Sequence, residues 1–280
     1  MDSPPLPSNR IGMSFRTDLA NFFDADSTSP PLDFAEVHIE AHQTANESLT
    51  LLMDRQLPIT LHSTSINIFG PNFLQNSESI DLVGQLADML DVETISTHLA
   101  SHEGSVGRIR SFFRPAYSAE LLDLTISRME QAEIVLGKPF AVENIAIYST
   151  NGPDDIDEIK FLNEIAAARP RRLIFDISNF SANAENGFAD METMEALSTE
   201  NVVYFHISGG RVHKQLFVDT HGDAIPERQL ESLSKLRNQI SQLDVLYERD
   251  VRFEKQQEIS SDLDAIESIV KSLPSPKQPS

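Results

Sequence analysis

The amino-acid sequence predicts an α/β protein folded as one (β/α)8 barrel, the TIM barrel. Eight short apolar runs with the length of strands recur along its 280 residues, and amphipathic stretches with helical spacing lie between them. No low-complexity linker, internal repeat or change in composition divides the chain. Eight strands that alternate with helices within about 250 ordered residues are typical of this barrel. A doubly wound open sheet is the alternative, but the strand count and the polar residues at the strand ends favour the barrel.

The predicted strands are short runs rich in Ile, Val, Phe and Leu, as expected for parallel strands that are buried on both faces. Flanking polar or turn-forming residues bound each run. In chain order the runs are Ile11–Phe15, Phe34–Ile39, Ile59–His62, Thr94–Leu99, Phe140–Asn144, Leu173–Ile177, Val202–Ile207 and Val245–Glu248.

The predicted helices carry apolar residues at intervals of three and four. The clearest of them is Ser118–Leu136, which opens on a serine suited to cap a helix N-terminus. Gly137 and the Arg169-Pro170 pair are expected to end two helices before the next strand begins. The other predicted helices are Ile80–Leu90, Asp154–Ala168, Pro226–Leu243 and Ile259–Val270.

The two ends of the chain differ in composition from the part between them. Residues 1–9 and 272–280 are rich in Pro and Ser and have little to bury, so we expect both to be disordered tails. Residues 10–271 are therefore predicted to form a single domain.

Composition and charge exclude several classes of protein. With 22 Lys and Arg against 43 Asp and Glu, the formal net charge of −21 opposes nucleic-acid binding. No apolar run approaches the ~18 residues of a membrane span, and the first residues lack the pattern of a secretory signal. The absence of cysteine excludes disulfides, thiolate metal sites and cysteine nucleophiles. By elimination we expect a cytoplasmic protein that binds neither membrane nor nucleic acid.

Titratable or metal-binding side chains end almost every predicted strand. In a barrel, the C-terminal ends of the strands meet at one face, where the active site is built. The turn after the seventh strand, VDTHGD, adds an Asp and a His that it can aim inward. The candidate residues are His62, His98, Glu143, Asp176, Asn179, His206, Asp219, His221 and Glu248.

A shared set of cations explains these residues better than independent structural roles. Each buried carboxylate without a partner costs several kcal/mol, and a cation both neutralises carboxylates and binds imidazoles. A single zinc ion needs only three or four ligands, so this set predicts more than one metal ion and a bridging carboxylate. Imidazole and carboxylate ligands without thiolate suit iron, manganese or zinc equally.

A second polar group lies on the predicted strand FAEVHIE. The period of two places Glu36, His38 and Glu40 on one face, where they would line the barrel interior or contact substrate. A polar layer satisfied by hydrogen bonds inside the barrel is the alternative.

Taken in order, the strand-end motifs resemble those of a known family. They are EVHIE, LHSTSINIFG, STHLAS, VENI, FDISN, FHISGG, VDTHGD and YERD, and they span residues 11–250. The chain is similar to the multinuclear non-haem iron-dependent oxidative enzymes, barrel proteins that include the iron subunit of methanobactin biosynthesis.

This resemblance implies that the nine candidate residues are iron ligands and that Glu143 is the bridge. It implies two or three ions in mixed Fe(II)/Fe(III) states, with O2 as co-substrate. The expected substrate is a residue, often cysteine, of a ribosomally made precursor peptide, which a separate recognition protein often delivers. Residues 10–271 would then be the catalytic domain.

The sequence also departs from that family beside the ligands. Arg249 replaces the usual Trp after the last Glu, Ser178 replaces an Asn, and Ser63-Thr64-Ser65 replaces a Gly-rich segment. Because neighbouring groups orient ligands and tune a metal, these changes bear on the identity of the substrate. We expect Arg249 to contact substrate together with Glu36, His38 and Glu40.

Two other functions remain open from the sequence. One is a divalent-metal barrel of the xylose-isomerase type, acting as an isomerase or an endonuclease-like phosphodiesterase. The lack of Lys at the strand ends opposes the isomerase, and the negative charge opposes the nuclease. The other is a metal-storage or partner-binding module without activity, which O2 consumption with a candidate peptide would distinguish from an enzyme.

Overall fold

A computed structural model describes residues 9–24, 30–41, 47–75, 77–104, 107–150, 152–240 and 242–272. The predicted tails lie almost wholly outside the described residues, which begin at Asn9 and end at Ser272. The Asn9 side chain accepts a hydrogen bond from the Leu243 backbone, and the Ser272 carbonyl accepts two from Arg237. These contacts tie both ends of the described chain to the domain.

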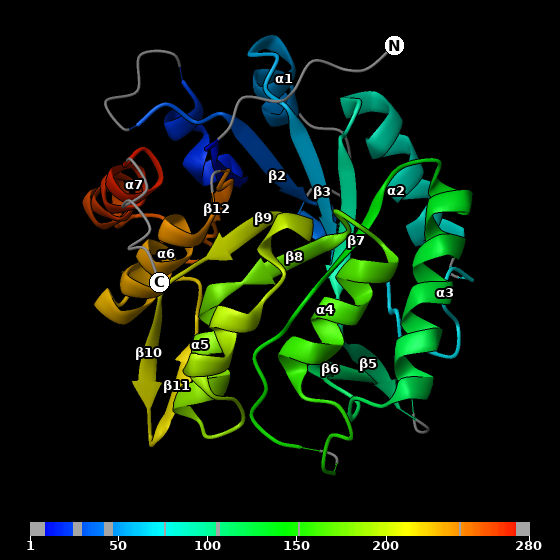
Figure 1. Ribbon diagram of the computed structural model, residues 1–280. Coiled ribbons are helices and arrows are strands. Elements are labelled where there is room, and N and C mark those ends of the chain that lie inside the picture. The colour runs from blue at the N-terminus through cyan, green and yellow to red at the C-terminus, as the bar shows by residue number, and fades with distance from the viewer. Residues whose placement is uncertain are drawn as a thin grey trace.

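Eight parallel strands close into a barrel, which confirms the predicted fold class (Figure 1). The order around the barrel is β1-β12-β9-β8-β7-β4-β3-β2, so neighbours in the sequence are neighbours in space. The strands are β1 (Ile11–Phe15), β2 (Phe34–His38), β3 (Ile59–Ser63), β4 (Thr94–His98), β7 (Phe140–Glu143), β8 (Leu173–Asp176), β9 (Val202–Ile207) and β12 (Val245–Tyr247).

Helices surround the barrel and follow its strands (Figure 1). The connection from β1 to β2 contains the 3-10 helix η1 (Thr17–Phe23). Ser118 caps the helix predicted over Ser118–Leu136 by accepting from the Leu121 backbone, and Gly137 ends it in the left-handed conformation with φ 65°. The α-helices are α1 (Glu47–Asp54), α2 (Ser77–Leu90), α3 (Ala119–Leu136), α4 (Glu158–Ala168), α5 (Ile177–Glu185), α6 (Glu227–Gln239) and α7 (Gln256–Val270). No described helix is long and apolar enough to cross a membrane.

Two hairpins extend the βα loops, and the sequence analysis predicts neither. Strands β5 (Ser101–Gly104) and β6 (Gly107–Phe113) follow β4, whereas β10 (Gly210–His213) and β11 (Leu216–Asp219) follow β9. Both hairpins lie at the lower end of the molecule in Figure 1, beyond the C-terminal ends of the barrel strands. They therefore extend the face on which the candidate site is expected.

The barrel interior is layered by the period of two along each strand. An apolar cluster from five strands occupies one layer: Phe34, Ala141, Ile174, Tyr204 and Leu246. Two positions further along the same strands stand Glu36, Glu143, Asp176, His206 and Glu248, all buried. Side chains two residues apart point the same way, so the apolar layer is the floor on which the titratable layer rests.

Candidate metal centre

Among the described residues, five groups of side chains could each hold a cation, and three of these groups consist of predicted ligands alone. In every group, one ligand atom from each residue lies within 4.8 Å of the others. Glu143 belongs to the first and second groups, and Asp176 to the second and third. The three groups made of predicted ligands alone are His62, His98 and Glu143; Glu143, Asp176, His206 and Glu248; and Asp176, Asp219 and His221.

The structure thus brings together eight of the nine predicted ligands and places the ninth beside them. Asn179, at the start of α5, lines a cavity together with four of these ligands, His98, Asp219, His221 and Glu248. Its side-chain nitrogen donates to the Asn144 carbonyl at 3.1 Å. This bond leaves the amide oxygen of Asn179 as the atom that a cation could use.

Barrel pairing explains why residues distant in the sequence converge here. His98 on β4 pairs with Glu143 on β7, and Asp176 on β8 pairs with His206 on β9. His206 Nδ1 lies 3.2 Å from Glu143 Oε1 and 3.4 Å from Glu248 Oε2. These potential ligands therefore lie close together because they come from the C-terminal ends of neighbouring strands.

The last residue of β11, Asp219, and the turn after it, which carries His221, supply two further candidate ligands. His221 adopts the left-handed backbone conformation, with φ 48°, which is unusual for a residue with a side chain. Its Nε2 lies 2.9 Å from Asp219 Oδ2, so the turn aims both side chains into the site as the sequence suggests. Backbone outliers of this kind are found at functional sites.

Hydrogen bonds from neighbouring residues hold Asp176 and Asp219 in place. Asn144 and Asp176 exchange two bonds, in which the Asn144 amide donates to the Asp176 carbonyl and its oxygen accepts from the Asp176 backbone. Asp176 Oδ1 then caps α5 by accepting from the Asn179 backbone at 2.8 Å. Ser208 donates to Asp219 Oδ1 at 2.7 Å.

Several ligand atoms are left without a hydrogen-bond partner in the described part of the chain. They are buried atoms of three predicted ligands, namely His98 Nδ1, Glu143 Oε2 and Asp176 Oδ2. A buried polar atom without a partner is costly, and each of these atoms belongs to a residue of a group that could hold a cation. Cations that accept nitrogen and oxygen ligands fit this site, and iron, manganese and zinc all do so.

The pKa shifts of the candidate ligands reflect their burial and the charges of their neighbours. Burial, with the nearby charges of Asp219 and Glu143, raises the pKa of Asp176 well above its ordinary value. Burial alone would lower the pKa of His206, yet the carboxylates of Glu143 and Glu36 raise it well above normal. Burial and the neighbouring His62 lower the pKa of His98 to about 4.

A cavity of about 260 Å³ leads to these residues. Phe112 from β6 and Tyr148 from the loop after β7 lie on its wall, and both rings are partly exposed. The Tyr148 hydroxyl accepts a hydrogen bond from the Asp219 backbone at 3.1 Å, which links the wall to a predicted ligand.

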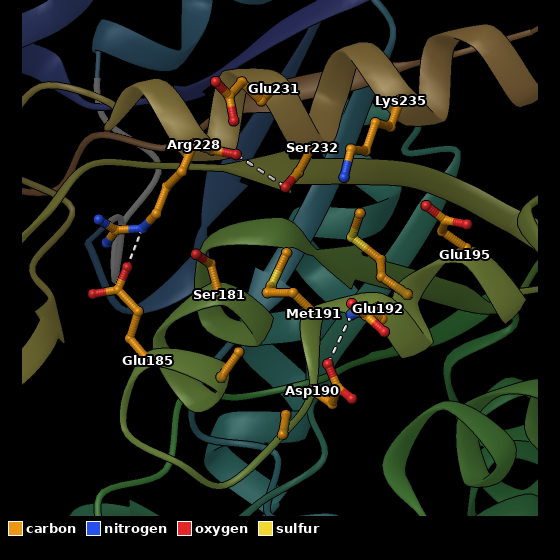
Figure 2. Close-up of a pocket in the computed structure, with 13 residues that line it drawn as sticks. Ser181, Glu185, Asp190, Met191, Glu192, Glu195, Arg228, Glu231, Ser232 and Lys235 are labelled. Carbon is orange, nitrogen blue, oxygen red and sulfur yellow. Dashed lines mark hydrogen bonds and ion pairs between the residues drawn. The ribbon is translucent and has the colours of Figure 1, made fainter.

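A larger cavity of about 430 Å³ lies on the outside of the barrel, between α5, α6 and the 3-10 helix Met191–Ala196 (Figure 2). Arg228 from α6 points across it to Glu185 of α5, with which it forms an ion pair. None of the described groups that could hold a cation contributes a residue to this cavity. Residues of the groups that could hold a cation line the smaller cavity instead.

The residues expected to contact substrate are placed in different surroundings. His38 lines the site cavity, and its Nε2 lies 3.2 Å from both Glu36 Oε1 and Glu248 Oε1. Glu36 is completely buried beneath the site. The prediction that Glu40 shares their face is wrong, because the strand ends at His38 and a short 3-10 helix follows.

The side chains of Glu40 and Arg249 hold loops together. Glu40 Oε1 accepts from the Ser63 hydroxyl and the Ser65 backbone after β3. The fully buried Arg249 guanidinium donates to three backbone carbonyls and to Glu258. The structure therefore places Arg249 away from the cavity in which substrate was expected to meet it.

Sequence reasoning missed Asp250 and the two cavity-wall aromatics. Asp250 Oδ2 lies 3.2 Å from His221 Nδ1, and a further group that could hold a cation joins these two residues to Glu248. The spacing of two between Glu248 and Asp250 in the YERD motif was the available signal. Phe112 and Tyr148 carry no such signal, because the hairpin strand β6 and the loop after β7 are placed by the packing of the whole fold.

Comparisons with known proteins agree with the family likeness of the motifs. Residues 10–271 match the family of the RiPP precursor modification enzymes MbnB/TglH/ChrH, where RiPP denotes a ribosomally made, modified peptide. A UPF0276 protein of Shewanella sediminis is 26% identical over 272 residues, covering 95% of this chain and 96% of that protein. The UPF0276 protein NMB2142 of Neisseria meningitidis serogroup B is 29% identical over 221 residues, covering 76% and 78%.

Solved structures share the fold at low sequence identity. A xylose isomerase domain protein from Planctomyces limnophilus has a TM-score of 0.61 at 12% identity, covering 95% of this chain and all of that one. A D-allulose 3-epimerase from Methylomonas sp. has a TM-score of 0.55 at 11% identity, covering 95% and 96%. At this identity the likeness shows the barrel alone. Because the family match covers nearly the whole barrel and its site, the chain belongs to the MbnB/TglH/ChrH family of RiPP precursor modification enzymes.

Proposed function

We propose that this protein is an iron-dependent oxidative enzyme that uses O2 to modify a residue, often cysteine, of a ribosomally made peptide. Membership of a family of peptide-modifying enzymes supports the substrate class. The observation that carries the proposal is the chain of three ligand groups joined by Glu143 and Asp176. The choice of iron and O2 follows the resemblance of the strand-end motifs to the iron-dependent family.

The proposed ligands divide among two or three ions that share carboxylates. Glu143 is common to the first two groups of predicted ligands and Asp176 to the last two, so these carboxylates would be shared if each group held an ion, while Glu248 belongs to the central group. Bound iron supplies one-electron chemistry with O2 and Lewis acidity toward a substrate atom. The proposed ligands are His62, His98, Glu143, Asp176, Asn179, His206, Asp219, His221 and Glu248.

The chain itself offers the peptide a cavity beside the proposed ligands. The cavity of about 260 Å³ is smaller than the ~300–1,000 Å³ typical of drug-sized ligands, which suits entry of one peptide side chain. Phe112, Tyr148 and Ile145 supply an apolar wall, and Thr64 a hydroxyl, beside the entering side chain. The proposal includes delivery of the peptide by a separate recognition protein, in keeping with the resemblance.

Two ligand variants test this proposal. His98→Ala and Asp219→Asn are expected to lower the iron content and to abolish peptide-dependent O2 consumption, because each removes one ligand atom from a group. Circular dichroism should show an unchanged fold, since neither side chain belongs to the apolar core.

The matched control is His213→Ala, which removes an exposed histidine of β10 outside every described ligand group. Its iron content and O2 consumption should equal those of the wild type. Equal iron occupancy in the wild type and in both ligand variants would remove His98 and Asp219 from the site.

A further inference from the structure

Beneath the proposed ligands, Glu36 reaches across the barrel from β2 to two side chains of β9. Its Oε2 accepts a hydrogen bond from the Tyr204 hydroxyl at 2.6 Å and lies 3.2 Å from His206 Nε2. Tyr204 and His206 are two residues apart on β9, so both point into the barrel. The Tyr204 hydroxyl also lies 3.3 Å from Thr60 Oγ1 on β3. All these side chains are buried.

The two nitrogens of His206 face different partners. Nδ1 faces Glu143 and Glu248, members of the central ligand group, while Nε2 faces Glu36. A carboxylate that accepts the Nε2–H bond selects the tautomer in which Nδ1 keeps a free lone pair. It also fixes the plane of the ring, which decides where that lone pair points.

We propose that Glu36 is a positioning residue that holds His206 in the orientation and tautomer required to bind a metal ion through Nδ1. The Tyr204 hydroxyl anchors the Glu36 carboxylate from below. This role replaces the substrate contact expected for Glu36, whose side chain is wholly inaccessible. The inference rests on the proposed function, because it assumes a cation in the group that contains His206.

A competing role for Glu36 is direct ligation. Glu36 Oε1, His38 Nε2 and a Glu248 oxygen form another group close enough to hold a cation. The two roles predict different numbers of bound ions. Loss of a ligand removes one ion, whereas loss of a positioning residue lowers the affinity for an ion that still binds at saturating metal concentration.

The test measures binding of Fe(II), and of Co(II) as a coloured substitute, to metal-free protein under anaerobic conditions. Competition with a chelator gives the affinities, and the visible spectrum of bound Co(II) reports the ligand field. The variants are Glu36→Leu, which removes the acceptor, Glu36→Gln, which keeps an acceptor without the charge, and Tyr204→Phe. Tyr247→Phe is the control, because this buried tyrosine donates to Asp262 outside the ligand groups.

The expected result is unchanged stoichiometry with weaker binding of one ion. Removal of such outer partners typically lowers metal affinity by about 10–100-fold, so Glu36→Leu should show a loss of that size and a shifted Co(II) spectrum. Glu36→Gln and Tyr204→Phe should show smaller losses, and the Tyr247→Phe control none.

Three results would overturn the inference. Wild-type affinity and spectrum in Glu36→Leu would show that Glu36 does not position His206. Loss of one whole ion in both Glu36 variants would make Glu36 a ligand. If Glu36→Leu does not fold, then affinity within twofold of the wild type in Glu36→Gln decides against the role. Failure of the wild type to bind any metal would instead refute the proposed function.

Discussion

Replacement of Arg249 by Met tests whether this residue holds the site loops or contacts substrate. The Arg249 side chain is fully buried and makes three hydrogen bonds to carbonyls, those of Asp223, Val251 and Arg252. A fourth bond joins it to Glu258 at 2.9 Å. These bonds tie the turn that carries His221 to the segment after Glu248.

The contacts of Arg249 set the expected decrease in the free energy of unfolding. Removal of the guanidinium leaves three carbonyls and Glu258 without this donor, and each such loss costs about 1–3 kcal/mol where the group stays buried. Because the Glu258 side chain is 27% exposed and can regain water, the lower end applies. Arg249→Met should therefore lower the free energy of unfolding by about 3 kcal/mol.

Urea unfolding at constant pH, followed by circular dichroism, measures this change. Arg211→Met is the matched control: Arg211 is 53% exposed and lies 3.7 Å from Asp223, so it should cost less than about 1 kcal/mol. A loss below about 1 kcal/mol in Arg249→Met would refute the structural role. Unchanged stability combined with a raised KM for peptide would restore the substrate contact.

Two further predictions concern stability and its pH dependence. Gly12→Ala should destabilise the folded protein by about 1–3 kcal/mol, because the new Cβ would lie 2.5 Å from the buried Phe34 ring. The control is Gly84→Ala in α2, whose new Cβ meets nothing within 4 Å and should stabilise the protein slightly. Thermal denaturation measures both changes. Burial raises the pKa of Glu158 from 4.5 to about 7 against the opposing charge of Arg114, so the folded state binds the extra proton and stability falls as pH rises through this window. Relative to Glu158→Gln, the wild type should lose about 3 kcal/mol between pH 4.5 and 7 in urea titrations, and parallel curves for the two proteins would contradict this prediction.

The sequence predicts the barrel well because five of its eight strands combine an apolar interior residue with a titratable one two positions later. Tyr204 and His206 illustrate the pattern, since the former belongs to the floor and the latter to the ligand layer. The strand boundaries agree with the structure to within one residue. The ligand positions follow from those boundaries, because parallel strands of a barrel end at one face.

Elements without a local signal escape such prediction. Helix α5 buries seven of its nine residues, so polar residues such as Ser178 and Asn183 do not mark a solvent-exposed face in ISNFSANAE. The β10–β11 hairpin turns at Lys214, whose φ is 56°, without the Asn-Gly or Asp-Gly pair that marks such turns. The positions of Phe112 and Arg249 depend on how the segments between strands pack against the barrel. Local sequence patterns do not predict this packing.

The most direct measurement is elemental analysis of the protein purified without oxygen from iron-supplemented cells. The proposed centre predicts two or three iron ions per chain, because the three ligand groups share Glu143 and Asp176. Zinc or manganese in place of iron, with iron unable to support peptide-dependent O2 consumption, would contradict the oxidative function. The absence of any stoichiometric metal would contradict the centre itself.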